Sequence, residues 1–420
     1  MELLEMNSRE RILASFAHKE PDRVPIDIGA TVTTGISGIA YYNLKKYLGI
    51  EEGHVRIIDL FQQLARVEDW FIDRFGIDAL DVGRTFLTDD KDWYDVSLNG
   101  IEAQFPKPIP VRENPDGSFE VVHEDGTVLG RMSKDALVMD QTHYPYLEGY
   151  PEDISFQSFM RSLDKLFGAK VAVPPFTNLG ERRFWRNLRE RAIDLREQTQ
   201  KITAINLSIT IFQGTHSYRR MDKLLTDTIR QPQNVEKLVR AFTDFYLNNL
   251  KVICKYLGDV VDIINFGDDL GENNGPMLSP RTYRNLIKPA HAELCDYIKK
   301  HSSMKIFFHS CGSILPLIPD LIEIGVDILN PVQINARDMD PKTLKEEFGD
   351  ELTFWGGGVD TRNILPRGSP EKVKKHVKNL LEIFAPGGGY VWNPIHNILA
   401  DVPPQNIVAM LDAVRQYEYD

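Results

Sequence analysis

Short apolar runs alternate with longer amphipathic segments from about residue 200 to the end of the chain. The runs lie at 205–212, 260–266, 304–308, 326–329, 352–355 and 390–392. Between them, segments such as 279–300, 370–384 and 404–417 carry apolar residues at the spacing of one helix face. Ser279-Pro280 and Ser369-Pro370 each place a capping side chain before a proline suited to the first helical position. Repeated strand-then-helix units predict a parallel sheet.

Two earlier segments, at 24–29 and 79–83, have the apolar character of further strands. They bring the number to eight, which predicts a single (β/α)8 TIM barrel over residues 1–420. An open, doubly wound sheet is the alternative. Neither a G-x-G-x-x-G turn nor a G-x-x-x-x-G-K-[ST] loop occurs in the sequence, so a nucleotide-binding version of that sheet has little support.

One segment, residues 92–150, breaks the alternating pattern because it is rich in Pro, Asp and Gly. Within it, residues 119–129 read as a hairpin that turns at Asp125-Gly126. The segment is too long for an ordinary connection. We therefore expect a β-rich insertion that lies as a flap over the barrel mouth, with mainly surface roles for His123 and His143.

Composition narrows the class of protein and its partners. Of 420 residues, 42% are hydrophobic and 26% are charged, as in a soluble globular protein. The net charge of −12 and the absence of a basic run argue against nucleic acid as a partner. Three widely spaced cysteines make no disulfide framework, and no secretory signal or membrane-spanning apolar run occurs. We expect a cytoplasmic protein without a membrane partner.

The run at 304–308 leads directly into His309-Ser310-Cys311-Gly312. On a strand, side chains two positions apart point to the same face, so His309 and Cys311 are expected to converge. An imidazole and a thiolate make half of a zinc site. Cys254 and Cys295 lie in helix-like segments and read as small buried apolar residues.

Polar residues follow most of the other predicted strands, at the end where barrel enzymes carry their active sites. His396 supplies a second imidazole for zinc, and Asp269 or Glu272 supplies an oxygen ligand or a partner that orients a histidine. The remaining residues are expected to shape the substrate site: Asp27, Asp81, Asp268, Asn330, Gln333, Asp360 and Asn393. A zinc ion with an open position lowers the pKa of a bound thiol and makes it a nucleophile at neutral pH.

Several motifs together resemble the uroporphyrinogen decarboxylase superfamily. They are Gly267-Asp268-Asp269-Leu270-Gly271 with Ser279-Pro280, His309-Ser310-Cys311-Gly312, the 356–361 segment Gly-Gly-Gly-Val-Asp-Thr, and the 393–407 segment containing Pro403-Pro404-Gln405-Asn406. The opening, from Arg9-Glu10-Arg11 to Val24-Pro25, is also similar. This resemblance implies a (β/α)8 barrel over nearly the whole chain.

The superfamily contains metal-free decarboxylases and zinc-dependent methylcobamide methyltransferases. The decarboxylases carry an arginine-rich M-R-Q-A-G-R segment, whereas this chain has Gly-Ala-Thr-Val-Thr-Thr-Gly at 29–35. The resemblance to the methyltransferase branch implies that His309 and Cys311 are zinc ligands. That branch has a later cysteine in a P-G-C-G sequence, where this chain has Pro394-Ile395-His396-Asn397. His396 is then either a substituted zinc ligand or a substrate-binding histidine.

Together with the predicted zinc ligands, this resemblance implies a zinc-dependent methyltransferase that moves a methyl group between a corrinoid protein and a small acceptor or methoxylated donor. The cofactors would be zinc and a methylcobamide carried by the partner. A metal-independent decarboxylase of a small carboxylated substrate is the alternative, with Asp27 or Asp81 stabilising a developing cation. A non-catalytic ligand-binding barrel is a third possibility.

Overall fold

A seven-stranded parallel sheet forms the centre of the molecule. The computed structural model describes residues 5–171 and 180–419, so the first four residues of the amino-terminal segment lie outside it. The sheet order is β18-β17-β16-β15-β12-β11-β4, and every neighbouring pair is parallel. The strands are β4 (Ala79–Asp81), β11 (Ile202–Ile209), β12 (Ile263–Gly267), β15 (Lys305–His309), β16 (Ile328–Asn330), β17 (Thr353–Trp355) and β18 (Tyr390–Val391).

The segment at 24–29 is not a regular strand, contrary to the sequence prediction. Only Ile26 pairs there, through isolated bridges to Trp392 beyond β18 and to Ile77 before β4. The N–H of Asp27 donates to the Trp392 carbonyl, and the N–H of Asp78 donates to the Ile26 carbonyl. Ile26 therefore lies between the two edges of the sheet, and the arrangement is consistent with a TIM-like barrel.

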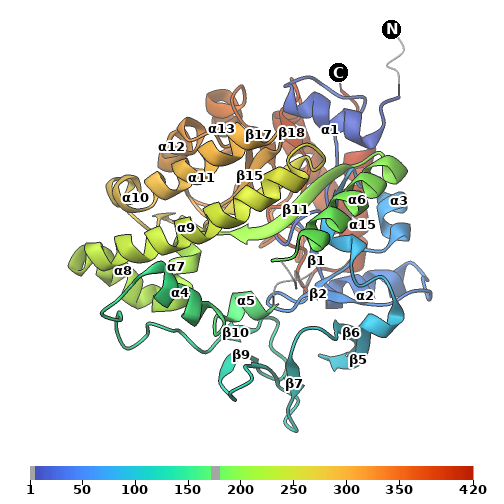
Figure 1. Ribbon diagram of the computed structural model, residues 1–420. Helices are drawn as coiled ribbons and strands as arrows, with labels where there is room; N and C mark the ends of the chain where they lie inside the picture. Colours follow the sequence, from blue (N-terminus) through green and yellow to red (C-terminus); the bar gives the residue numbers. More distant parts are fainter. Residues whose placement is uncertain (1–4, 172–179, 420) are drawn as a thin grey trace.

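The helices lie around the outside of this sheet (Figure 1). Up to residue 257 they are α1 (Ser8–Phe16), α2 (Gly38–Tyr47), α3 (Asp69–Phe75), α4 (Phe156–Leu163), α5 (Phe167–Val171), α6 (Arg182–Thr199), α7 (Phe212–Arg219), α8 (Met221–Arg230) and α9 (Pro232–Leu257). The others are α10 (Pro280–Leu286), α11 (Lys288–His301), α12 (Ile318–Glu323), α13 (Pro341–Phe348), α14 (Pro370–Phe384) and α15 (Pro404–Arg415). Of the helices in the described ranges, none has the length and apolar character that crossing a membrane requires.

Local capping explains where several helices begin. Ser279 and Ser369 accept hydrogen bonds from backbone N–H groups of α10 and α14, with prolines at the first helical position, as predicted. Asn7 and Glu10 form a capping box at the start of α1. Cys254 on α9 and Cys295 on α11 are buried, which confirms the prediction for both.

The segment between β4 and α4 is rich in short strands. These are β5 (Trp93–Leu98), β6 (Ile101–Pro106), β7 (Val111–Glu113), β8 (Phe119–Val122), β9 (Val128–Met132) and β10 (Asp140–Gln141). β8 and β9 form the predicted hairpin around Asp125-Gly126. The six strands gather away from both chain ends, at the bottom of the view in Figure 1. That this segment acts as a flap over the mouth remains a prediction.

Smaller antiparallel pairings complete the fold. β1 (Ile36–Ser37), β2 (Ile57–Asp59) and β3 (Leu64–Ala65) form one sheet, and β13 (Gly271–Glu272) pairs with β14 (Gly275–Pro276). The β13–β14 pair directly follows β12, at the carboxyl end of the central sheet. It therefore borders the region where the polar residues singled out in the sequence gather.

Candidate metal centre

The interior of the central sheet changes from apolar to polar along the strands. A small buried cluster fills one end, with members on six strands: Ala79, Ala204, Ile263, Phe307, Ile328 and Val391. Two positions later on each strand, and so on the same face, the residue is polar. These residues, here called the polar layer, are Asp81, Asn206, Asn265, His309, Asn330 and Asn393. The layer lies at the carboxyl ends of the strands, where barrel enzymes bind their substrates.

His309, Cys311 and His396 come together at this end of the sheet. One ligand atom from each lies within 4.8 Å of the other two. Among residues 5–171 and 180–419, no other group of three His, Cys, Asp or Glu side chains comes together in this way. Cys311 Sγ is 3.3 Å from His309 Nε2, and the two imidazole centroids are 5.5 Å apart. β15 ends at His309, so Cys311 lies just beyond the strand, yet its sulfur still converges on the imidazole.

Asn330 determines which nitrogen of His309 carries the proton. Its Nδ2 donates to the Trp355 carbonyl at 2.7 Å, and a carbonyl can only accept. The other amide atom, Oδ1, therefore faces His309 Nδ1 at 2.5 Å and accepts a hydrogen bond from its N–H. Nε2, the atom close to Cys311, is therefore the nitrogen that can bind a metal. Burial lowers the pKa of His309, but Cys311 and Asp269 outweigh it and raise the pKa well above its usual value, so Nε2 must release a proton when a cation binds.

Burial affects the other two ligands in opposite ways: it prepares His396 for a cation but disfavours the thiolate of Cys311. It lowers the pKa of His396 to about 4, so this imidazole is neutral at pH 7 and has a lone pair available. It also raises the pKa of the Cys311 thiol, more than the neighbouring His309 lowers it. A divalent cation would supply the positive charge that favours the thiolate. Two nitrogen donors and one sulfur donor fit zinc with an open fourth position.

Asp269 lies next to this group. One carboxylate oxygen is 3.4 Å from His309 Nε2 and accepts from the Cys311 N–H at 2.9 Å, while the other accepts from Gln213 Nε2 at 2.8 Å. Burial raises the pKa of Asp269, but the hydrogen bond and charge of His309 outweigh it and the pKa falls below its usual value. Asp269 is therefore a fixed anion. Glu272, predicted as a ligand, is exposed and is not among the three grouped residues.

Asp268 lies beside Asp269, but its side chain contacts the start of α7 and His291 on α11. Its carboxylate accepts hydrogen bonds from three backbone N–H groups, those of residues 211–213 at the start of α7. It also contacts His291 Nε2 at 2.7 Å, and both side chains are fully buried. The structure thus makes Asp268 a cap of α7, and any role in binding a substrate remains a prediction.

Other predicted site residues lie around the three grouped ligands. Gln333 accepts from the Gly312 N–H at 2.8 Å and so holds the turn after Cys311. Asp360 accepts from Asn335 and from the backbone of its own loop. Asn393 is fully buried and donates to the Asp27 carbonyl at 2.9 Å. These contacts are structural, and any role of the residues in binding a substrate remains a prediction.

Asp27 and Asp81 are the two predicted carboxyl groups with raised pKa values. Burial raises the pKa of Asp27 to about 7, although the Ala30 N–H and Trp355 Nε1–H both donate to it. Burial raises the pKa of Asp81 to about 6, against a hydrogen bond from the Gly83 N–H. Both groups therefore titrate closer to neutral pH than an ordinary aspartate does.

Asn206 and Asn265 belong to the polar layer but were not singled out in the sequence. They lie inside β11 and β12, three and two residues before the strands end, among apolar neighbours. The available signal was the period of two: Ala204 and Asn206, like Ile263 and Asn265, share one face. Polar side chains inside a strand, such as these two amides, can therefore belong to a site as well as the residues that follow the strand.

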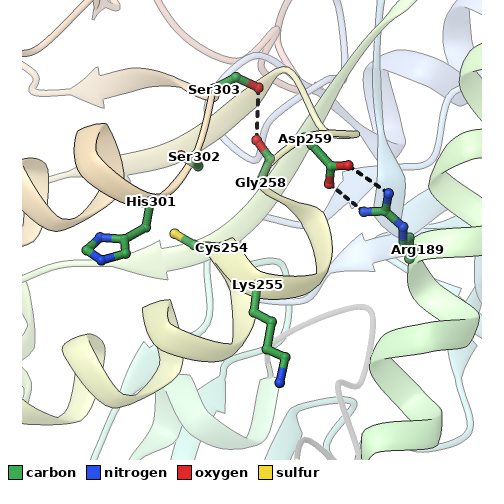
Figure 2. A pocket seen from close by; sticks show the side chains of 8 residues that line it. All are labelled: Arg189, Cys254, Lys255, Gly258, Asp259, His301, Ser302 and Ser303. Atoms are coloured by element: carbon green, nitrogen blue, oxygen red, sulfur yellow. Dashed lines mark hydrogen bonds and ion pairs between the residues drawn. The ribbon is translucent and has the colours of Figure 1, made fainter.

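A separate cavity of about 420 Å³ lies at the opposite end of the strands, where residues 258–259 precede β12 and 302–303 precede β15. Figure 2 shows its lining. Arg189 pairs with Asp259, with Nη2 to Oδ2 at 2.7 Å, and Ser303 donates to the Gly258 carbonyl. The charges of Arg189 and Asp259 neutralise each other, and barrel enzymes do not use this end of the strands for chemistry. The metal centre is therefore the stronger candidate site.

Comparison with known proteins defines the family. The family model for uroporphyrinogen decarboxylase (URO-D) matches residues 205–417, just over half of the chain, and the chain belongs to this family. Uroporphyrinogen decarboxylase of Pseudoalteromonas translucida is 26% identical over 175 residues, covering 39% of this chain and 47% of the relative. That of Pseudoalteromonas atlantica is 26% identical over 148 residues, covering 34% and 39%. The alignments span less than half of these curated relatives.

One solved structure supports the fold over the full length. A methyltransferase from Methanosarcina mazei superposes with a TM-score of 0.58 at 16% identity, covering 98% of this chain and 99% of that one. At this level of identity the likeness concerns the fold alone. The predicted membership of the URO-D superfamily is thus confirmed, together with an α/β fold consistent with a TIM-like barrel.

Proposed function

We propose that this protein is a zinc-dependent methyltransferase, which moves a methyl group between a corrinoid protein and a small acceptor or methoxylated donor. The observation that carries the proposal is the convergence of His309, Cys311 and His396, with ligand atoms within 4.8 Å of one another. The family membership and the methyltransferase-like fold agree with it. The donor set would leave one position open for a substrate.

The residues around the group have separable tasks in this proposal. His309, Cys311 and His396 would hold zinc, which acts as a Lewis acid toward the substrate atom that gives or receives the methyl group. Asn330 keeps the proton of His309 on Nδ1. Asp269 stays ionised beside His309 and balances positive charge in a buried place. Gln333 orients the turn that carries Cys311.

Metal analysis and methyl transfer together test this function. We expect about one zinc ion per chain, and transfer of the methyl group of methylcobalamin to a thiol acceptor. His309→Ala, Cys311→Ala and His396→Ala should each lower the zinc content and abolish transfer. Cys254→Ala and His301→Ala serve as matched controls, because these residues lie at the opposite end of the strands. Zinc-free protein whose activity survives His309→Ala and Cys311→Ala would refute the proposal.

A metal-independent decarboxylase is the second candidate. It is supported by the raised pKa values of Asp27 and Asp81, about 7 and about 6, and by the decarboxylase relatives. In that reaction a protonated carboxyl group would donate a proton to the substrate, and the resulting carboxylate would stabilise the cation, which takes up the electron pair released as carbon dioxide leaves. Carbon dioxide release that persists in chelator, and that Asp81→Asn abolishes, would favour this candidate over methyl transfer.

A further inference from the structure

Two asparagines of the polar layer, Asn206 on β11 and Asn265 on β12, lie side by side in register. Asn206 Nδ2 donates to the Ala30 carbonyl at 3.0 Å. A carbonyl accepts only, so this contact sets the orientation of the Asn206 amide, with Oδ1 on the other side. Asn265 Nδ2 donates to that Oδ1 at 2.8 Å. The orientation of the second amide therefore follows from the first.

The consequence is that Asn265 presents an oxygen to the barrel interior. Its nitrogen is committed to Asn206, and no residue of the described ranges donates a hydrogen bond to its Oδ1. Asn265 is 6% exposed, and its Oδ1 is not among the fully enclosed polar atoms that lack a partner. A nearly buried acceptor that retains some access from the mouth is suited to a donor group of a ligand.

The position of this oxygen relates it to the metal centre. Gly267, two residues further along the same face of β12, pairs in register with His309 on the neighbouring strand. Because Gly267 has no side chain, no side chain of β12 stands between Asn265 and the mouth; the backbone of His309 fills the place that a Cβ would take, with its carbonyl oxygen 2.4 Å away. Strand spacing and rise place the Asn265 and His309 Cα atoms about 8 Å apart. A spacer of three or four atoms covers such a distance.

We propose that Asn265 is a specificity-determining residue, which accepts a hydrogen bond from a hydroxyl or amino group of the metal-bound substrate while Asn206 holds its amide in that orientation. This inference rests on the proposed function. It names the substrate class as small molecules that carry a hydrogen-bond donor three or four atoms from the atom bound to the metal. Molecules with an alkyl group at that place would leave the buried oxygen unpaired.

Two thiols of equal length test this selectivity. Cobalt-substituted protein is titrated with 3-mercapto-1-propanol and with 1-butanethiol, and binding is followed by the visible absorption of cobalt. We expect the hydroxyl thiol to bind about tenfold more tightly, which is the effect of one buried hydrogen bond. Asn265→Leu should reduce this ratio to less than about twofold. Asn248→Leu, the same replacement at an exposed position of α9, is the matched control and should retain the preference.

The outcomes are distinguishable. Equal binding of the two thiols by the native protein, or a preference that Asn265→Leu leaves unchanged, overturns this inference alone. Protein that binds no cobalt, or whose spectrum responds to neither thiol, overturns the proposed function and this inference with it. Cobalt content and thermal unfolding of both variants show that a lost preference is not a loss of folding.

Discussion

Replacement of Asn330 by leucine should weaken zinc binding without touching a ligand. Asn330 is fully buried and makes three hydrogen bonds: to the Trp355 carbonyl at 2.7 Å, from His309 Nδ1 at 2.5 Å and from Thr33 Oγ1 at 3.1 Å. Leucine has the same number of side-chain heavy atoms and the same branching, although it is bulkier, and it leaves all three partners unsatisfied. Each buried unsatisfied group costs about 1–3 kcal/mol, so the free energy of unfolding should fall by about 3–9 kcal/mol.

Zinc affinity should fall together with stability. Without Oδ1, the proton of His309 is no longer held on Nδ1, so Nε2 is no longer fixed as the nitrogen that binds the metal. Loss of a partner that orients a metal ligand costs about 10- to 100-fold in affinity, equivalent to about 1.4–2.7 kcal/mol. Competition with a chromophoric chelator measures the affinity, and urea unfolding of the metal-free protein measures the stability.

A second variant separates the two effects. Asn330→Asp keeps an oxygen that accepts from His309 Nδ1 but loses the donor to the Trp355 carbonyl. It should lower stability while retaining zinc affinity, because a carboxylate partner raises the basicity of the ligand. The reasoning would be refuted by an Asn330→Leu protein that folds and binds zinc as tightly as the native protein, or by equal losses of affinity in both variants.

Two further predictions concern stability. Because the pKa of Asp27 is raised to about 7, the folded state holds a proton that the unfolded state releases near pH 4. The free energy of unfolding should therefore fall by up to about 4 kcal/mol as the pH rises from about 4 to about 7. Urea titrations at several pH values should show a flatter profile for Asp27→Asn. Arg219 is buried, pairs with Asp227 at 2.7 Å and donates to two carbonyls at 146–147, so Arg219→Met should cost about 3–5 kcal/mol. Its neighbour Arg220 is exposed and pairs with Asp222 on the surface, so Arg220→Met should cost less than about 1 kcal/mol, and equal losses for the two variants would contradict this account.

The strand boundaries show where local pattern stops being informative. The apolar run at 205–212 predicts a strand through Phe212, but β11 ends at Ile209 and Phe212 begins α7. The N–H groups at the start of this helix donate to Asp268, more than fifty residues away in sequence. An apolar run cannot show where the strand ends and the helix begins, because the carboxylate that binds the first N–H groups of the helix comes from a distant part of the chain.

The amino-terminal segment at 24–29 illustrates the same limit. Its alternating apolar residues predict a strand, yet only Ile26 is bridged to both neighbours. Asp27 instead turns into the interior and binds Trp355, and Gly29 has a positive φ of 96° that begins the following loop. The pattern identifies the segment as part of the sheet region, but hydrogen-bond pairing depends on partners at Ile77 and Trp392.

The sequence by itself determined the strand-and-helix alternation, the helix starts at proline and serine, and the chemistry of the His309–Cys311 pair, since these depend on residue type and short spacing. Only the tertiary structure decided that His396 lies beside that pair, that Glu272 does not join it, and that Asp268 caps a helix. It also decided the orientation of the Asn206, Asn265 and Asn330 amides. The physical reason is that an amide side chain has no preferred direction until a carbonyl from a distant part of the chain accepts its N–H.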